Sequence, residues 1–119
     1  SRFDVIVTLN LYGDILSDVA AGVAGGLGFA PSGNIGQKHS VFEPAHGSAP
    51  DIAGKGVANP TATILAAAMM LDHLGMPREA RDVEAAVSET YSSGHLTVDL
   101  GGRHGSSSFT DHVVRRMRA

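Results

Sequence analysis

The sequence predicts an α/β fold, in which helices pack in layers against a sheet. Three observations support this: an apolar, β-branched stretch at residues 3–9, a glycine-rich middle over residues 25–58, and helical segments after residue 59. Strand, helix, loop and further helices in this order are typical of an α/β layer architecture. With 119 residues, 43% of them hydrophobic and 18% charged, the chain can bury one modest core. We expect residues 1–119 to form a single, incomplete α/β unit.

The first elements are predicted to be a strand and an amphipathic helix. Residues 3–9 are apolar without alternation, which favours a buried, parallel strand. A helix is expected from about Asp14 to Ala24, and the two glycines that follow should end it. Its apolar positions form one stripe: Ile15, Leu16, Val19 and Val23. The loop-rich stretch beyond this helix holds one expected strand, at residues 40–42.

Three helices are predicted in the second half of the chain. The first is apolar nearly all round and should be buried, while the second and third are amphipathic. Their boundaries follow from capping residues: Asn59 and Pro60 begin the first and Gly75 ends it, Pro77 begins the second and Gly94 follows its end, and Ser107 or Ser108 caps the third. These helices are interpreted as a scaffold for the segment that precedes them.

Charge and composition exclude several classes of protein. The net charge of −3 argues against a nucleic-acid partner and against an anionic membrane surface. No apolar run is long enough to span a bilayer. The chain has no cysteine, which fits an intracellular protein, and no targeting peptide is visible, so we expect a cytoplasmic location. The chain opens directly on the expected strand, which favours a fragment of a longer protein.

Two carboxylates stand four residues apart at the start of the first helix. Asp14 and Asp18 should project from one face, opposite the apolar stripe. A divalent cation that prefers oxygen ligands, Mg²⁺ or Mn²⁺, would relieve their mutual repulsion and keep positions open for a substrate. The spacing alone favours an ordinary solvated acidic face, with Asp14 suited to the helix N-terminus.

A loop of small residues runs from Glu43 to Pro60. Its glycines and alanines would let backbone N–H groups approach a phosphate or ribose, close to the positive end of a helix. Neither a G-x-G-x-x-G fingerprint nor a P-loop is present, so a purely structural loop stays an alternative. The six histidines show no metal-ligand pairing on one helix, and surface or packing roles are expected for all except His46.

These motifs resemble the isocitrate/isopropylmalate dehydrogenase family, the metal-dependent β-decarboxylating dehydrogenases. The resemblance covers most of residues 3–119. Three segments carry it in order, namely residues 10–18, 25–36 and 42–60, which read NLYGDILSD, GGLGFAPSGNIG and FEPAHGSAPDIAGKGVANP. The resemblance implies the C-terminal part of the family's large α/β domain.

The resemblance also implies an activity and a set of site residues. The activity is oxidation of a 2-hydroxy acid (isocitrate, homoisocitrate or 3-isopropylmalate) by hydride transfer to NAD, followed by loss of CO₂. The substrate's hydroxyl and carboxylate would bind Mg²⁺ or Mn²⁺ held by Asp14 and Asp18. The residues that the resemblance assigns to the cofactor are Glu43, His46, Gly47, Ser48, Ala49, Asp51, Ile52, Ala58 and Asn59. Among them His46 would lie beside adenosine, and Glu43 near nicotinamide.

Several groups that the family needs have no match in this chain. Its substrate arginines, catalytic Lys and Tyr, and a third metal-ligand Asp would lie upstream, so no general acid or base is expected here. Two hypotheses stand: part of a complete dehydrogenase, or a stand-alone fragment or degenerate relative that binds nucleotide or a partner without catalysis. An intact mass near the chain's own 12.3 kDa would support the second.

Three finer expectations follow from the resemblance. The sequence of residues 33–36 and 42–44 is closer to that of isocitrate and homoisocitrate dehydrogenases than to that of isopropylmalate dehydrogenases. Asp51 occupies the position at which the family binds the adenosine ribose. A carboxylate there would accept hydrogen bonds from the ribose hydroxyls and repel the 2′-phosphate of NADP, which favours NAD. The first helix lies near a two-fold interface in the family, so a homodimer or a higher homo-oligomer is expected.

Overall fold

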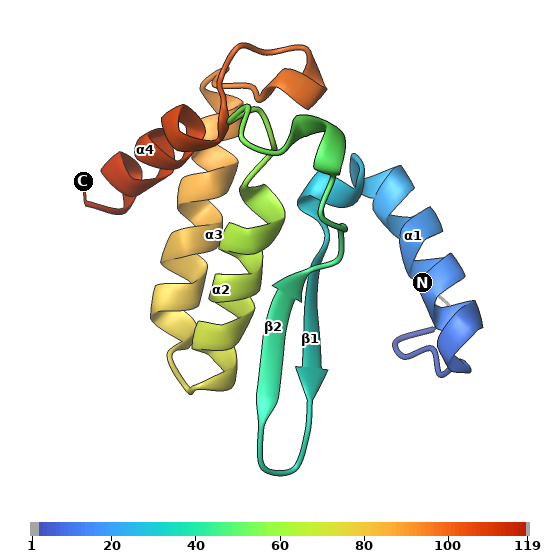
Figure 1. Cartoon of the computed structure of the whole chain (residues 1–119). Helices are drawn as coiled ribbons and strands as arrows, with labels where there is room; N and C mark the ends of the chain where they lie inside the picture. The colour runs from blue at the N-terminus through green and yellow to red at the C-terminus, as the bar shows by residue number, and fades with distance from the viewer. Residues whose placement is uncertain (1–2, 119) are drawn as a thin grey trace.

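The computed structural model describes residues 3–118 and shows a β-hairpin between two groups of helices (Figure 1). The helix α1 (Asn10–Ala24) lies on one side of the hairpin, which consists of β1 (Pro31–Ile35) and β2 (Ser40–Pro44). On its other side α2 (Thr61–His73) packs against both strands and against α3 (Pro77–Ser92). The last helix, α4 (Ser106–Met117), packs on α3.

The predicted strand at residues 3–9 is wrong. These residues form no regular element before α1, and their apolar side chains face outward, with Val7 91% exposed. A buried parallel strand needs neighbours on both sides. Within residues 3–118 the sheet consists of β1 and β2 alone, paired with each other, so residues 3–9 have no strand to join.

The first helix begins at Asn10, four residues before the expected start, and ends as predicted. Gly25 terminates it with a φ of 121°, and its N–H donates to the Ala21 carbonyl. Ala21 is the buried residue of α1. The apolar stripe is uncovered within the described part of the chain: Ile15, Leu16, Val19 and Val23 are all exposed.

One strand of the hairpin was predicted and the other was not. The strand expected at residues 40–42 is confirmed as β2, which pairs antiparallel with β1 and aligns Gly33 with Phe42. A Cβ on Gly33 would lie 3.2 Å from the Phe42 ring and 3.4 Å from the Met69 side chain. β1 was missed because its Pro, Gly and Asn have low strand propensity, and packing decides its conformation.

The core lies where α2, α3 and α4 meet. Its buried centre is formed by Ala86, Val87, Phe109 and Val113, with Ile64, Leu65 and Tyr91 packed against it. Tyr91 sits between two rings, 5.3 Å from Phe29 and 4.7 Å from Phe109 between centroids. The predicted ends of α3 are confirmed.

Two details of the predicted helices are wrong. The helix α2 is not buried all round, because Met69 and Met70 are 37% and 40% exposed. The helix α4 begins at Ser106 with Gly105 as its N-cap, not Ser107 or Ser108, because Ser106 N–H is held by the Gly56 carbonyl at 2.8 Å. Within residues 3–118 no helix combines the length and apolar character needed to cross a membrane.

Candidate functional site

The loop between β2 and α2 is shaped by three left-handed residues. Ala49 has a φ of 44°, and Gly54 and Gly56 have φ values of 76° and 65°. A short 3₁₀ helix, η2 (Pro50–Ile52), lies between them. Left-handed backbone favours glycine because it has no Cβ, so the glycines of the sequence allow the chain to fold back on itself here. Alanine at position 49 is an unusual residue for that conformation.

This loop borders a cavity of about 800 Å³. Seven of the nine residues predicted to bind the cofactor line it: His46, Gly47, Ser48, Ala49, Ile52, Ala58 and Asn59. His46 is half-buried, and its ring Nδ1 lies 2.9 Å from the Gly47 carbonyl, to which an Nδ1–H donates. Its Nε2 is then the nitrogen left for a ligand.

Two of the predicted cofactor residues stand outside the cavity lining. Glu43 projects from β2, is exposed, and accepts a hydrogen bond from Asn34 Nδ2 at 3.3 Å. Asp51 is exposed in η2, next to Ile52, which does line the cavity. Asp51 therefore stands at the rim, where it can reach only the outer part of a bound molecule.

Other residues of the cavity lining were missed because they come from distant parts of the sequence. They are Leu27 and Gly28 of the 3₁₀ helix η1 (Leu27–Phe29), Ala53, Gly54, Gly56 and Val57 of the loop, Asp99 of η3 (Val98–Leu100), and Ser106 of α4. Gly28 packs against Asn59, since a Cβ on it would lie 3.2 Å from the Asn59 side chain. Ser106 donates its hydroxyl to the Ala58 carbonyl.

Asn59 joins three of these segments. Its Oδ1 accepts from the Thr61 N–H at 3.0 Å and from the Tyr91 hydroxyl at 3.3 Å. The prediction that Asn59 is the N-cap of α2 is wrong by one residue, because the helix begins at Thr61 with Pro60 at the N-cap. Its Nδ2 donates to Asp99 Oδ2 at 3.0 Å. The side chain is buried, with 9% of its surface exposed. Asn59 therefore shapes the cavity wall, and most of its hydrogen-bonding groups are already engaged.

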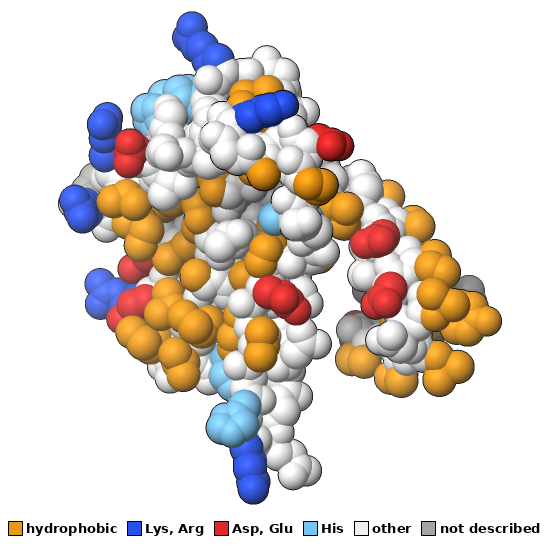
Figure 2. Space-filling view, in the orientation of Figure 1, with side chains coloured by type: hydrophobic (Ala, Val, Ile, Leu, Met, Phe, Trp, Pro, Cys, Tyr) orange, Lys and Arg blue, Asp and Glu red, His pale blue; other side chains and the backbone are white. Residues whose placement is uncertain are grey.

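The two predicted metal ligands are exposed and one turn apart on α1. Figure 2 shows acidic side chains on the side of α1 nearer the hairpin and hydrophobic ones along its outer side, as the sequence predicts. Neither Asp14 nor Asp18 joins a third histidine or carboxylate at metal-binding distance within residues 3–118. Two exposed oxygen ligands fit a hard cation such as Mg²⁺ or Mn²⁺, which keeps several waters and takes few protein ligands.

Comparisons with known proteins identify the family of this chain. A model of the family described as isocitrate/isopropylmalate dehydrogenase matches residues 1–113. The chain is 63% identical over 118 residues to an isocitrate/homoisocitrate dehydrogenase of Thermus thermophilus, covering 99% of this chain and 35% of that protein. It is 58% identical over 113 residues to a 3-isopropylmalate dehydrogenase of Archaeoglobus fulgidus, covering 95% of this chain and 35% of that protein.

A solved structure matches equally well. The crystal structure of isocitrate dehydrogenase from Methylococcus capsulatus aligns with a TM-score of 0.94 and 53% identity, covering 99% of this chain and 36% of that chain. The chain thus spans about a third of the length of the curated relatives described above. Sequence and structure both confirm the predicted resemblance and the predicted α/β fold: the chain belongs to the isocitrate/isopropylmalate dehydrogenase family.

Proposed function

We propose that this chain supplies the cofactor cavity and two metal ligands of an NAD-dependent dehydrogenase that oxidises and decarboxylates a 2-hydroxy acid. The observation that carries the proposal is the cavity of about 800 Å³, lined by seven residues that the sequence assigns to the dinucleotide. The volume is in the range of small-molecule sites. The names of the two relatives, an isocitrate/homoisocitrate and a 3-isopropylmalate dehydrogenase, support the substrate class.

The cavity is built to hold the adenosine part of NAD. Small side chains at Gly47, Ser48 and Ala49 let the backbone approach a ribose or a phosphate closely. The N-terminal end of α2 follows Asn59 and places the positive end of its dipole beside the cavity. His46 offers a flat ring and a free Nε2 beside this space.

Asp14 and Asp18 would hold Mg²⁺ or Mn²⁺ through their carboxylate oxygens. A bound metal would lower the pKa of the substrate hydroxyl, and a bound dinucleotide would accept the hydride from the carbon that carries this hydroxyl. The resemblance assigns the acid of this chemistry to neither tyrosine of this chain. Tyr91 is packed between two aromatic rings and lies 2.7 Å from the Thr61 hydroxyl, while Tyr12 is exposed on α1. The acid/base pair is therefore proposed to come from outside this chain.

A substrate panel tests the proposal. The full-length protein, supplied with NAD and Mg²⁺ or Mn²⁺, should reduce NAD with isocitrate, homoisocitrate or 3-isopropylmalate. The sequence of the hairpin favours the first two. A clear preference for 3-isopropylmalate would overturn that choice of substrate and leave the dehydrogenase in place, whereas no NAD reduction with any of the three acids would overturn the proposed function.

A further inference from the structure

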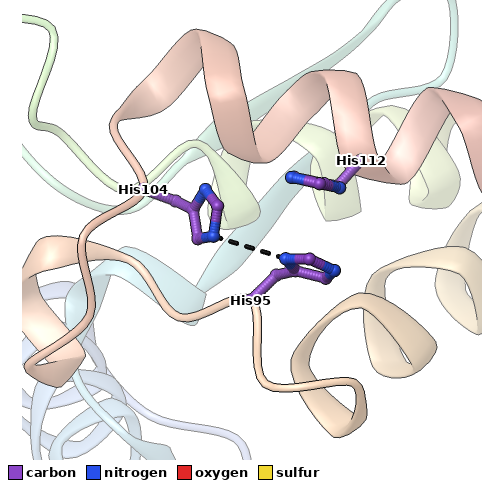
Figure 3. Close-up of side chains that lie close together, drawn as sticks. All are labelled: His95, His104 and His112. Carbon is purple, nitrogen blue, oxygen red and sulfur yellow. Dashed lines mark hydrogen bonds between the residues drawn. The ribbon is translucent and has the colours of Figure 1, made fainter.

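Three histidines from separate parts of the chain meet at the end of α3. His95 follows α3, His104 precedes α4, and His112 lies on α4. Figure 3 shows their three rings directed toward one another. They border a second cavity, of about 630 Å³. The sequence predicted surface or packing roles for these residues, because no two of them share a ligand spacing on one helix. The fold brings them together.

Two of the three rings already have the spacing of ligands on one ion. His95 Nδ1 and His104 Nε2 are 3.3 Å apart. Tetrahedral Zn²⁺ with Zn–N bonds of 2.0–2.1 Å separates two ligand nitrogens by about 3.3–3.4 Å. Each of the three histidines has one ring nitrogen within 4.8 Å of those of the other two. The cluster therefore needs a small contraction, not a rearrangement of the backbone.

The ring positions show which side chain has to move. Ring centroids of two imidazoles on one tetrahedral ion are separated by about 5.2 Å, from the same bond lengths. His104 lies 5.1 Å from His95 and 4.9 Å from His112, which matches this separation. His95 and His112 are stacked at 3.8 Å, too close for two such ligands. His112 is half-buried beside the cavity, so its ring has room to turn.

The backbone around the histidines is held tightly. His104 N–H donates to the Leu96 carbonyl at 3.1 Å, and His95 N–H donates to the Thr90 carbonyl at 3.2 Å. Gly102 lies against Leu96 so closely that no Cβ would fit. His104 Nδ1 lies 2.8 Å from the Ser108 hydroxyl. When Nδ1–H donates to that hydroxyl, Nε2 presents its lone pair to His95, as outer hydrogen bonds orient metal-ligating histidines in general.

The ligand atoms select the kind of ion. The cluster offers three imidazole nitrogens and no carboxylate, which suits Zn²⁺, Co²⁺ or Ni²⁺ and not Mg²⁺ or Ca²⁺.

We propose that His95, His104 and His112 bind one divalent transition-metal ion of the Zn²⁺ type, with the fourth position open to the cavity. The ion would connect the end of α3 to α4 through three side chains. Because an ion that binds only the folded state stabilises it, the site would fasten the C-terminal helix to the core.

Titration of the metal-free, full-length protein with Zn²⁺ in the presence of excess Mg²⁺ tests this proposal. The excess Mg²⁺ occupies sites made of oxygen ligands, such as the one proposed at Asp14 and Asp18. We expect one high-affinity Zn²⁺ per chain by calorimetry, a rise in Tm, and for Co²⁺ the visible absorption of a tetrahedral complex. His112→Gln should weaken Zn²⁺ binding by more than about tenfold, because it removes a direct ligand.

Two further variants make the test specific. His104→Gln, in a loop outside any helix, should have the same effect as His112→Gln and serves if the variant in α4 loses its fold. His39→Gln is the matched control, because His39 is exposed at the tip of the hairpin and should leave Zn²⁺ binding unchanged. No stoichiometric binding, or equal affinity in His104→Gln, His112→Gln and the unmodified protein, would show a hydrogen-bonded imidazole cluster without a metal site.

Discussion

The side chain of Asn59 illustrates how one residue serves both the helix and the cavity. It accepts from the first N–H of α2 and from Tyr91 and donates to Asp99, so it ties α2, α3 and η3 to the loop. Asp99 is exposed and the Tyr91 hydroxyl also lies 2.7 Å from the Thr61 hydroxyl, so the N–H of the buried Thr61 is the group that loss of Asn59 would leave without a partner. The position of the cavity wall therefore depends on this carboxamide.

Replacing Asn59 tests that dependence. Asn59→Ala should lower the free energy of unfolding by about 1–3 kcal/mol, since it leaves the N–H of the buried Thr61 without its partner and removes the hydrogen bonds to Asp99 and Tyr91. Urea unfolding of the full-length protein measures the change. Asn34→Ala is the control, because Asn34 is exposed on the hairpin and should change stability by less than about 0.5 kcal/mol. Equal effects of the two substitutions would contradict the role given to Asn59.

The proposed metal ligands can be tested by removing charge without changing shape. Asp14→Asn or Asp18→Asn in the full-length protein should weaken Mg²⁺ or Mn²⁺ binding and reduce turnover by more than about hundredfold. Each replaces a charged ligand by a neutral one at a site where few groups share the ion. Circular dichroism should show the fold retained. Asp82→Asn, on the exposed side of α3, is the control. Normal activity in the double variant would leave Asp14 and Asp18 as a solvated acidic face.

We expect Asp51 and its neighbour Ile52 to decide the choice between NAD and NADP. The exposed Asp51 stands at the rim of the cavity, where a carboxylate would accept hydrogen bonds from ribose and repel the 2′-phosphate of NADP. We expect the unmodified full-length protein to prefer NAD by about a hundredfold or more in kcat/KM.

The matching substitution should reverse that preference in part. Asp51→Lys combined with Ile52→Tyr should move the kcat/KM ratio toward NADP, because lysine can pair with the phosphate. Asp82→Lys, a similar charge change far along the chain in α3, should leave the ratio unchanged. Equal kcat/KM for NAD and NADP in the unmodified protein would refute the role of Asp51 in the preference for NAD.

Among the elements, α1 stands apart from the core. It contacts the short helix η1, and its apolar stripe is exposed, with Val23 88% accessible. A continuous apolar face of this kind marks an interaction surface. Small residues beside the stripe would allow another helix to approach closely: Ala20, Ala21, Gly22 and Ala24. We propose that α1 forms part of the interface of a homodimer, as the resemblance implies.

A charge placed in that stripe tests the interface. Val23→Asp should shift the full-length protein from dimer to monomer in sedimentation, because a buried, unpaired carboxylate is costly at an interface. Val41→Asp is the control, since Val41 is exposed on β2, away from α1. If the Val23→Asp protein stays dimeric and equally stable, α1 does not form the interface.

The molecule as a whole depends on the packing of α4 against α3. Phe109 is completely buried and contacts Tyr91, whose hydroxyl in turn bonds Asn59, so the core and the cavity are connected. Phe109→Ala should destabilise the protein by about 3–5 kcal/mol through lost burial and a residual cavity. Leu74→Ala, at an exposed position after α2, should cost less than about 0.5 kcal/mol. Chemical unfolding compares the two; similar losses would show that α4 is not part of the cooperative core.

The cytoplasmic location stays a prediction, which cell fractionation would check.

Local patterns were sufficient to predict the helices and the family. Helix hydrogen bonds join residues four apart, so Pro77, Gly25 and Gly94 mark the ends of helices without reference to the rest of the chain. The loop over residues 46–59 is contiguous, and the family resemblance of this segment identified seven of the fifteen residues that line the cavity.

Contacts between distant residues decided the rest. A strand is stabilised by its partner strands, so residues 3–9 form no strand, because they are apolar but unpaired. β1 has weak strand propensity and is stabilised by its contacts with Phe42 and α2. Asp99 and Ser106 join the cavity from more than forty residues beyond His46, and the three histidines meet only because α4 folds back on α3. The sequence by itself determined the helices, the family and the loop chemistry, since these depend on neighbours along the chain. The tertiary structure alone decided the hairpin, the cavity wall and the histidine cluster, because each is made by contacts between residues that are distant in the sequence.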